Sequence, residues 1–194
     1  MNKYLGLLEL RRLPLPCIQW EEFKMGCHFS EDCLWTVRVA NREGVDTSLP
    51  CKLGITSDEV VQYASRLSSQ YDLVIVSEYF FAHISGVLMV NFDELIIEWT
   101  YGDSHRLTRQ GFVEENIHLR FPTPAIGKSK LDETIVKKLY QYANLIWYRY
   151  RDNLLSNKSV VLEWSLTAPA NIKDSSKKYH YSAGQIIFYD FRIV

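Results

Sequence analysis

The chain has 194 residues, of which 47% are hydrophobic and 23% are charged, and these proportions are typical of a globular protein with one domain or one two-lobed unit. A formal net charge of −1 supplies no broad attraction to nucleic acid or to an anionic membrane, so we expect neither partner. The stretch MNKYLGLLELRR lacks the apolar core of a signal peptide, and no run approaches the roughly 18 apolar residues of a membrane span. We therefore expect a cytoplasmic protein.

The first half of the chain contains two predicted helices with a strand between them. The apolar spacing of residues 2–12 predicts a short helix, which the prolines of the following LPLP end because proline cannot continue the backbone hydrogen bonds. Residues 34–40, LWTVRVA, are typical of a strand. At the start of residues 56–67, Thr56 and Glu59 have the spacing of a capping box. The apolar face of this second helix is predicted to comprise Val60, Val61, Ala64 and Leu67.

The second half contains mainly strands and one long helix. The predicted strands are residues 71–80, 83–90, 94–101, 160–167 and 186–194. The second and third of these flank NFD, a sequence typical of a hairpin turn, so we expect them to pair antiparallel. The longest predicted helix runs from Leu131 to about Leu154. Residues 168–184 are rich in turn-forming and charged residues, which predicts a loop.

Alternation along the predicted strands places charged side chains opposite the apolar faces. Glu163 lies opposite Leu162 and Trp164, and simple alternation puts Asp190 on the same face as Phe188. The charged residues on such polar faces are Arg38, Glu98, Glu163, Asp190 and Arg192.

Two interpretations of these polar faces stay open. They are the solvated side of an antiparallel sheet, or they form a cleft in which carboxylates hold Mg²⁺ and arginines hold phosphate oxygens. Magnesium suits the second interpretation because it often uses only one or two carboxylates together with substrate phosphates. Arginine suits it because its guanidinium binds two phosphate oxygens at once.

The cysteines and histidines form no recognisable metal or catalytic motif. The four cysteines lie within the first 51 residues without a C-x-x-C pair, and even with His28 their spacing matches no common zinc module. We interpret them as reduced thiols, including Cys51 beside Lys52. The histidines interpreted as surface or structural residues are His28, His83, His105, His118 and His180.

Six phrases, in the same order along the chain, resemble the nucleotide-binding domain of phosphoenolpyruvate synthase and pyruvate phosphate dikinase. They are NKYLGLLELRRLPLP, WTVRVANREG, VIVSEYFFAHISGVLMV, IIEWTYGD, VVLEWSL and IIFYDFRIV. The resemblance implies an α+β, ATP-grasp-like fold with a mainly antiparallel sheet flanked by helices. It also implies a reduced N-terminal lobe, residues 1–70, and a C-terminal sheet lobe, residues 71–194. In SGV, Gly86 is expected to allow close strand packing.

The resemblance implies ATP and Mg²⁺ as ligands and assigns residues to each. Glu163 and Asp190 would hold magnesium, although the family has glutamine where this chain has Asp190. The strand around Ser77 and Glu78 would line the adenine pocket. The residues that would contact or lie near the nucleotide are Lys3, Arg38, Ser77, Glu78, Glu98 and Arg192.

The departures from the family leave the function open between two alternatives. The chain lacks the family's phosphohistidine carrier motif, and only about twenty residues separate LPLP from the strand of Arg38. An active domain would therefore need a protein partner that supplies the phosphoryl acceptor. A degenerate relative would instead act as a non-catalytic binding or interaction protein, and an unrelated domain with solvated acidic residues is the third interpretation.

Overall fold

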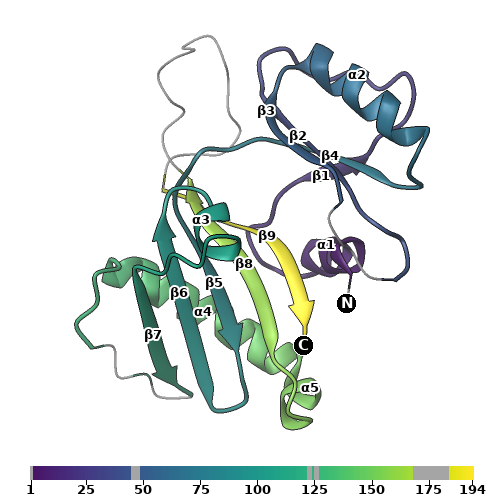
Figure 1. The fold of residues 1–194 in the computed structure, drawn as a ribbon. Helices are drawn as coiled ribbons and strands as arrows, with labels where there is room; N and C mark the ends of the chain where they lie inside the picture. Colours follow the sequence, from purple (N-terminus) through teal and green to yellow (C-terminus); the bar gives the residue numbers. More distant parts are fainter. Residues whose placement is uncertain (1, 45–48, 122–123, 125–126, 168–183) are drawn as a thin grey trace.

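The computed structural model describes residues 2–44, 49–121, 124, 127–167 and 184–194, which form two antiparallel sheets and several helices. The strand order is β1-β4-β2-β3 in the small sheet and β7-β6-β5-β8-β9 in the large sheet. Figure 1 shows the small sheet above the large one, with helices packed against each. The predicted α+β class, with mainly antiparallel sheets flanked by helices, is confirmed.

The small sheet is built from β1 (Trp20–Glu22), β2 (Trp35–Val39), β3 (Cys51–Ile55) and β4 (Val74–Glu78), and α2 (Ser57–Ser68) packs against it. The predicted capping box at the start of α2 is present, since Thr56 and Glu59 bond each other's backbone N–H groups. The predicted apolar face of α2 is only partly right. Val60, Ala64 and Leu67 are buried, whereas Val61 is exposed because it lies about 100° around the helix from Val60.

The large sheet is built from β5 (Ala82–Val90), β6 (Glu94–Tyr101), β7 (Glu115–Arg120), β8 (Val160–Thr167) and β9 (Ile186–Ile193). The predicted hairpin of β5 and β6 is confirmed, and Gly86 allows its strands to pack closely. A β-carbon on Gly86 would lie 2.4 Å from the Glu98 carbonyl oxygen and 2.6 Å from the Trp164 ring. The glycine is therefore required by the neighbouring strands.

Helices cover the large sheet on the face away from the small sheet. The predicted helix from Leu131 to Leu154 forms as α4 (Glu133–Arg149) and α5 (Arg151–Leu155), because Tyr150 leaves helical geometry with φ −112° and ψ 22°. The buried face of α4 joins the core that contains Trp99 and Trp164. Among the described residues, no helix is long and apolar enough to cross a membrane.

Helix α1 (Lys3–Arg12) lies against β9. It ends just before the prolines, as predicted. Contact is close because Gly6 has no side chain, and a β-carbon there would lie 2.2 Å from the Phe191 carbonyl oxygen. Asn2 caps the helix by accepting a hydrogen bond from the Leu5 N–H at 3.0 Å. The packing of α1 on β9 brings the Lys3 side chain to the edge of the large sheet.

The two sheets do not divide the chain at residue 70. Strand β4 follows that residue yet is central in the small sheet, and α1 precedes it yet packs on β9 of the large sheet. The sequence-based lobes 1–70 and 71–194 therefore do not follow the sheets. The predicted loop of residues 168–184 lies, except for Gly184, outside the described residues, as does His180.

A bulge in β9 overturns one detail of the predicted alternation. Glu163 pairs with Asp190, but the next residue of β8, Trp164, pairs with Phe188, so Tyr189 is an extra residue in β9. Phe188 is consequently buried in the core beneath the sheet and does not share the face of Asp190. Tyr189 and Asp190 both line the opposite, cleft side.

Candidate functional site

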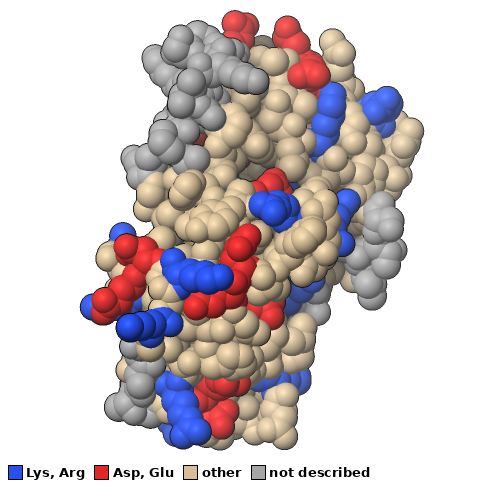
Figure 2. Space-filling view, turned by 60° about the vertical axis from the view of Figure 1, so that its left-hand side comes forward, with Lys and Arg blue, Asp and Glu red and all other residues tan. Residues whose placement is uncertain are grey.

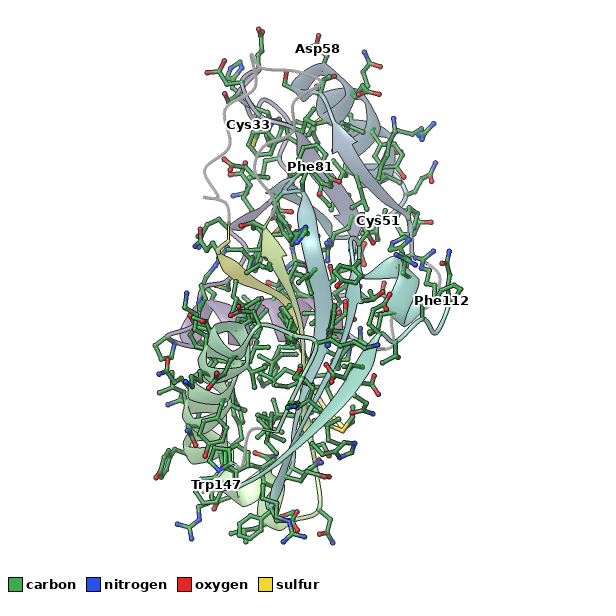
Figure 3. All side chains as sticks on the ribbon, turned by 90° about the vertical axis from the view of Figure 1, so that its left-hand side faces the viewer. Cys33, Cys51, Asp58, Phe81, Phe112 and Trp147 are labelled. Carbon is green, nitrogen blue, oxygen red and sulfur yellow. The ribbon has the colours of Figure 1, made fainter. Side chains whose placement is uncertain are left out.

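A cleft of about 630 Å³ lies between the two sheets. Its floor is the face of the large sheet opposite α4, and its upper wall comes from β2 and β3. The short helix α3 (His105–Thr108) and the residues beside it form a side wall. Basic and acidic side chains lie next to one another across the middle of the molecule (Figure 2). Figure 3 shows Cys51 at the end of the small sheet that lies nearest to α3. The cleft is large enough for a small-molecule ligand.

Two carboxylates lie side by side on the floor of the cleft. Glu163 and Asp190, which the resemblance assigns to magnesium, are direct partners across β8 and β9. One Arg192 nitrogen, Nη2, donates to both, at 3.1 Å to Glu163 Oε1 and 2.7 Å to Asp190 Oδ2. Lys3 Nζ lies 3.7 Å from Asp190 Oδ2. The pair is therefore held by two cationic side chains from α1 and β9.

Asp190 keeps one oxygen without a hydrogen bond. The residue is 1% exposed, and its Oδ1 atom accepts no hydrogen bond from any described residue. A buried carboxylate oxygen of this kind requires a partner, because burying it unpaired is costly. Two adjacent carboxylates with an open oxygen fit Mg²⁺, which takes hard oxygen ligands and accepts the rest of its shell from phosphates and water. Among the described residues, no group of three or more His, Cys, Asp or Glu side chains could hold a metal alone.

Burial raises the pKa of the Glu163 carboxyl, and the negative charge of Asp190 raises it further. The positive charges of Arg192, Lys3 and Arg38 oppose this shift but do not cancel it. The cleft therefore favours a proton, or another cation, on this carboxylate.

Glu163→Gln should change how the free energy of unfolding depends on pH. Because the folded pKa of Glu163 is raised, the folded chain binds its proton more tightly than the unfolded chain, and stability falls as pH rises between the ordinary and the raised pKa. Glutamine cannot ionise, so the variant should gain stability relative to wild type across that interval. Urea titrations from pH 4 to pH 8 would measure the free energy of unfolding of variant and wild type, and Glu21→Gln at an exposed position of β1 is the control. Parallel profiles for Glu163→Gln and wild type would contradict the buried-pair geometry.

Six of the eight residues that the sequence assigned to ATP or magnesium line the cleft. They are Lys3, Arg38, Glu98, Glu163, Asp190 and Arg192. Glu98 and Glu163 flank Val87 across three neighbouring strands, so they belong to one row of the floor. Arg38 reaches the cleft from β2 in the opposite sheet.

The other two assigned residues lie elsewhere. Ser77 and Glu78 are not among the described residues that line the cleft. Ser77 is instead buried within the small sheet, where it pairs with Trp20 and Thr36. The chain turns toward the cleft only after β4 ends, so Tyr79 and Phe80 line it instead. Alternation could not locate this turn, because the sequence of residues 74–80, VIVSEYF, shows no change of pattern where β4 ends.

Sequence reasoning also missed the side wall and the polar floor. The wall is Asp103 to Arg109, a stretch with no hydrophobic periodicity, and it includes His105, which had been interpreted as a surface or structural residue. The hydroxyls of Ser85, Ser165 and Tyr189 lie on the floor. The exposed thiol of Cys51 lines the cleft as well, and none of the four cysteines, all of which the structure describes, forms a disulfide.

Comparison with known proteins rests on structure, since no protein-family model and no curated protein matches the chain. The dinucleotide-forming acetyl-coenzyme A synthetase 1 of Ca. Korarchaeum cryptofilum is similar with a TM-score of 0.56 at 12% identity, over 100% of this chain and 92% of that one. D-alanyl-alanine synthetase A of Vibrio cholerae gives 0.54 at 11% identity, over 98% of this chain and 54% of that one. The D-alanine-D-alanine ligase of Coxiella burnetii gives 0.52 at 11% identity, over 100% of this chain and 47% of that one.

The fold is ATP-grasp-like. At these identities the likeness shows the ATP-grasp-like fold alone, and the chain spans about half the length of the two D-alanine ligases. The predicted fold class is confirmed, whereas the specific resemblance to phosphoenolpyruvate synthase stays a prediction.

Proposed function

We propose that the cleft binds a nucleoside triphosphate, ATP, as its Mg²⁺ complex. The observation that carries this proposal is the buried Asp190 carboxylate with an open oxygen beside Glu163, ringed by basic side chains in an ATP-grasp-like fold. A ligand that brings both a metal ion and phosphates satisfies the carboxylates and the cations together.

The roles of the residues follow from their charge and place. Arg38 approaches from the small sheet and Arg192 from the large one, so together they would hold phosphate oxygens from two sides, with Lys3 at the α1 edge. Glu163 and Asp190 would hold the magnesium ion, which when bound neutralises phosphate charge during transfer. Since Arg192 bonds both carboxylates, phosphate binding would draw its guanidinium toward the ligand.

The base of the nucleotide belongs beside the segment that joins the sheets. Ser77 and Glu78 were assigned to this pocket, and we now assign Tyr79 and Phe80, which follow them and line the cleft. Aromatic rings provide the apolar surface that a purine requires, and Phe80 is fixed by its contact with Tyr189, with ring centroids 5.9 Å apart.

The proposed activity is activation of a phosphoryl group by positioning and charge neutralisation. A protein partner or another, unknown compound would supply the acceptor of the phosphoryl group. This follows the type of reaction of the phosphoenolpyruvate synthase family, which the sequence resembles. The degenerate alternative is favoured by one observation, the bridge of Arg192 between Glu163 and Asp190, which puts a guanidinium where a metal ion would lie.

Isothermal titration with ATP, with and without Mg²⁺, should show binding that is stronger with the metal present. The reason is that magnesium screens the repulsion between phosphates and the two carboxylates. Adenosine in place of ATP is the control, and it should bind far more weakly because it lacks phosphates. Absence of ATP binding under both conditions would overturn the proposal and favour the non-catalytic interaction protein.

A further inference from the structure

Arg192 already supplies a positive charge to Glu163 and Asp190, the carboxylate pair on the cleft floor. Its Nη2 atom donates to Glu163 Oε1 at 3.1 Å and to Asp190 Oδ2 at 2.7 Å. A terminal guanidinium nitrogen carries two N–H groups, so these two bonds use both of them. A metal ion shared by the carboxylate pair would need the same two oxygens. The guanidinium and a metal ion therefore compete for one position.

Arg192 satisfies the carboxylate pair only in part. The Asp190 side chain is 2% exposed, yet its Oδ1 atom accepts no hydrogen bond from any described residue. Arg192 thus does not form with Asp190 the two-pronged pair, in which two guanidinium nitrogens bond both oxygens of one carboxylate and which is the stronger arrangement. A phosphate group can offer the guanidinium that two-pronged contact. The contact with Asp190 is therefore one that a phosphate can replace.

The guanidinium of Arg192 also has access to the cleft. Its side chain is 46% exposed, whereas the side chain of Asp190 is almost fully buried, and it lines the cleft. Arg192 lies two residues after Asp190 in β9, so both side chains leave the strand on the same face. Rotation about its flexible stem can turn the guanidinium toward a ligand in the cleft while its backbone stays in the sheet. The two carboxylates, in contrast, are held on the sheet floor.

The charges around the carboxylate pair disfavour a bare divalent cation. Arg192, Lys3 and Arg38 all act on Glu163 as positive charges. With both carboxylates ionised, three positive charges face two negative ones. Glu98 lies two strands away on the floor, about 10 Å at the usual strand spacing, where salt screens most of its charge. A bare cation would add to the excess of positive charge, and a polyphosphate would reverse it.

We propose that Arg192 is a placeholder cation, which keeps free divalent metal ions out of the carboxylate pair until a polyphosphate draws its guanidinium away. The polyphosphate half of this inference rests on the proposed function, whereas the exclusion of free metal ions does not. One side chain then couples the two ligands, and each raises the affinity for the other, because a coupling free energy is reciprocal. Arg192 makes the site specific for a metal-bound polyphosphate over the free metal ion.

Free Mn²⁺, used in place of Mg²⁺ and without any phosphate, tests the exclusion of metal. Electron paramagnetic resonance measures the Mn²⁺ that stays unbound. Arg192→Ala should bind Mn²⁺ at least about tenfold more tightly than wild type, because a charged hydrogen-bonding competitor is gone. Arg192→Gln keeps an N–H donor for the carboxylates without the charge, so it should show the same gain if Arg192→Ala folds poorly. Mn²⁺ should also raise the urea midpoint of Arg192→Ala and not that of wild type.

Arg38→Ala is the matched control for the loss of a positive charge. Arg38 acts on Glu163 through its charge, but none of the ion pairs among the described residues joins it to the carboxylate pair. The variant should therefore bind free Mn²⁺ about as weakly as wild type. Equal gains in Arg38→Ala and Arg192→Ala would overturn the proposal, because net charge would then exclude the metal. Wild type that binds free Mn²⁺ as tightly as Arg192→Ala would overturn it as well.

Inorganic tripolyphosphate tests the second half of the inference. Mn²⁺ that tumbles with a protein relaxes water protons faster than Mn²⁺ in a small complex. Wild type should therefore enhance the relaxation with Mn-tripolyphosphate and not with Mn²⁺ alone, and equal relaxation in the two samples would refute the coupling. A gain of Mn²⁺ binding in Arg192→Ala, when wild type fails to bind ATP, supports the exclusion and refutes only the nucleotide proposal. Wild type that binds both ATP and free Mn²⁺ tightly refutes only the placeholder.

Discussion

Gly6→Ala should lower the free energy of unfolding by about 3 kcal/mol, because the new methyl group has no space. Its β-carbon would lie 2.2 Å from the Phe191 carbonyl oxygen, and backbone of a buried strand cannot move aside as a flexible side chain can. Helix α1 would have to lift from β9 and expose the buried Leu7 and Leu10. Urea denaturation followed by circular dichroism would measure the loss.

The sign of the change in the free energy of unfolding distinguishes the effect of packing from the intrinsic helix propensity of alanine. Alanine normally stabilises the interior of a helix by about 1 kcal/mol relative to glycine, so an isolated α1 would gain from the same substitution. Leu5→Ala is the matched control on the same helix, since Leu5 is 47% exposed, and it should change stability little. A stabilised Gly6→Ala protein would mean that α1 does not lie against β9, and Lys3 would lose its place beside Asp190.

The sequence predicted the parts of the fold that depend on regular patterns. Alternation correctly placed Glu163 opposite the buried Trp164, and the capping pattern of Thr56 located the start of α2. Both follow from local geometry that repeats along the chain. The short strands β1, β3 and β7 were not predicted, because three to six residues with mixed polarity carry too little periodicity.

The candidate site was predictable where it lies on regular strands and not where the backbone departs from them. Alternation assumes one residue per step, so it could not reveal the bulge that puts Tyr189 and Asp190 on one side of β9. Glu78 was assigned to the cleft from the family resemblance alone, and the sequence does not show where the chain leaves the small sheet. The α3 wall depends on the turn at Gly102, whose φ is 76°, and on contacts between segments far apart in sequence.

Arg192→Ala should have two effects that can be separated, a loss of stability and a loss of nucleotide affinity. Its guanidinium bonds Asp190, which is 1% exposed, so its removal leaves a buried carboxylate whose remaining ion-pair partner among the described residues is Lys3. Because the Arg192 side chain is 46% exposed and water screens its charge, leaving this buried carboxylate without the guanidinium costs less than breaking a fully buried pair, about 2 kcal/mol. If Arg192 also holds phosphate, ATP should bind about 10-fold to 100-fold more weakly, which corresponds to the roughly 1.5–3 kcal/mol of a charged hydrogen bond.

The double variant Asp190→Asn with Arg192→Ala distinguishes the two roles of the arginine. Neutral asparagine needs no cationic partner, so the double variant should recover most of the stability that Arg192→Ala loses. It should not recover ATP affinity, because the phosphate contact is absent and the amide oxygen that remains at position 190 is a weaker, uncharged ligand for magnesium. Arg192→Lys should recover stability while losing the part of the affinity that requires the two-pronged guanidinium. Titration of all three variants with Mg-ATP, beside their urea midpoints, would measure both quantities. If ATP affinity follows stability through the series, so that the double variant binds like wild type, then Arg192 only neutralises Asp190 and the phosphates lie elsewhere in the cleft.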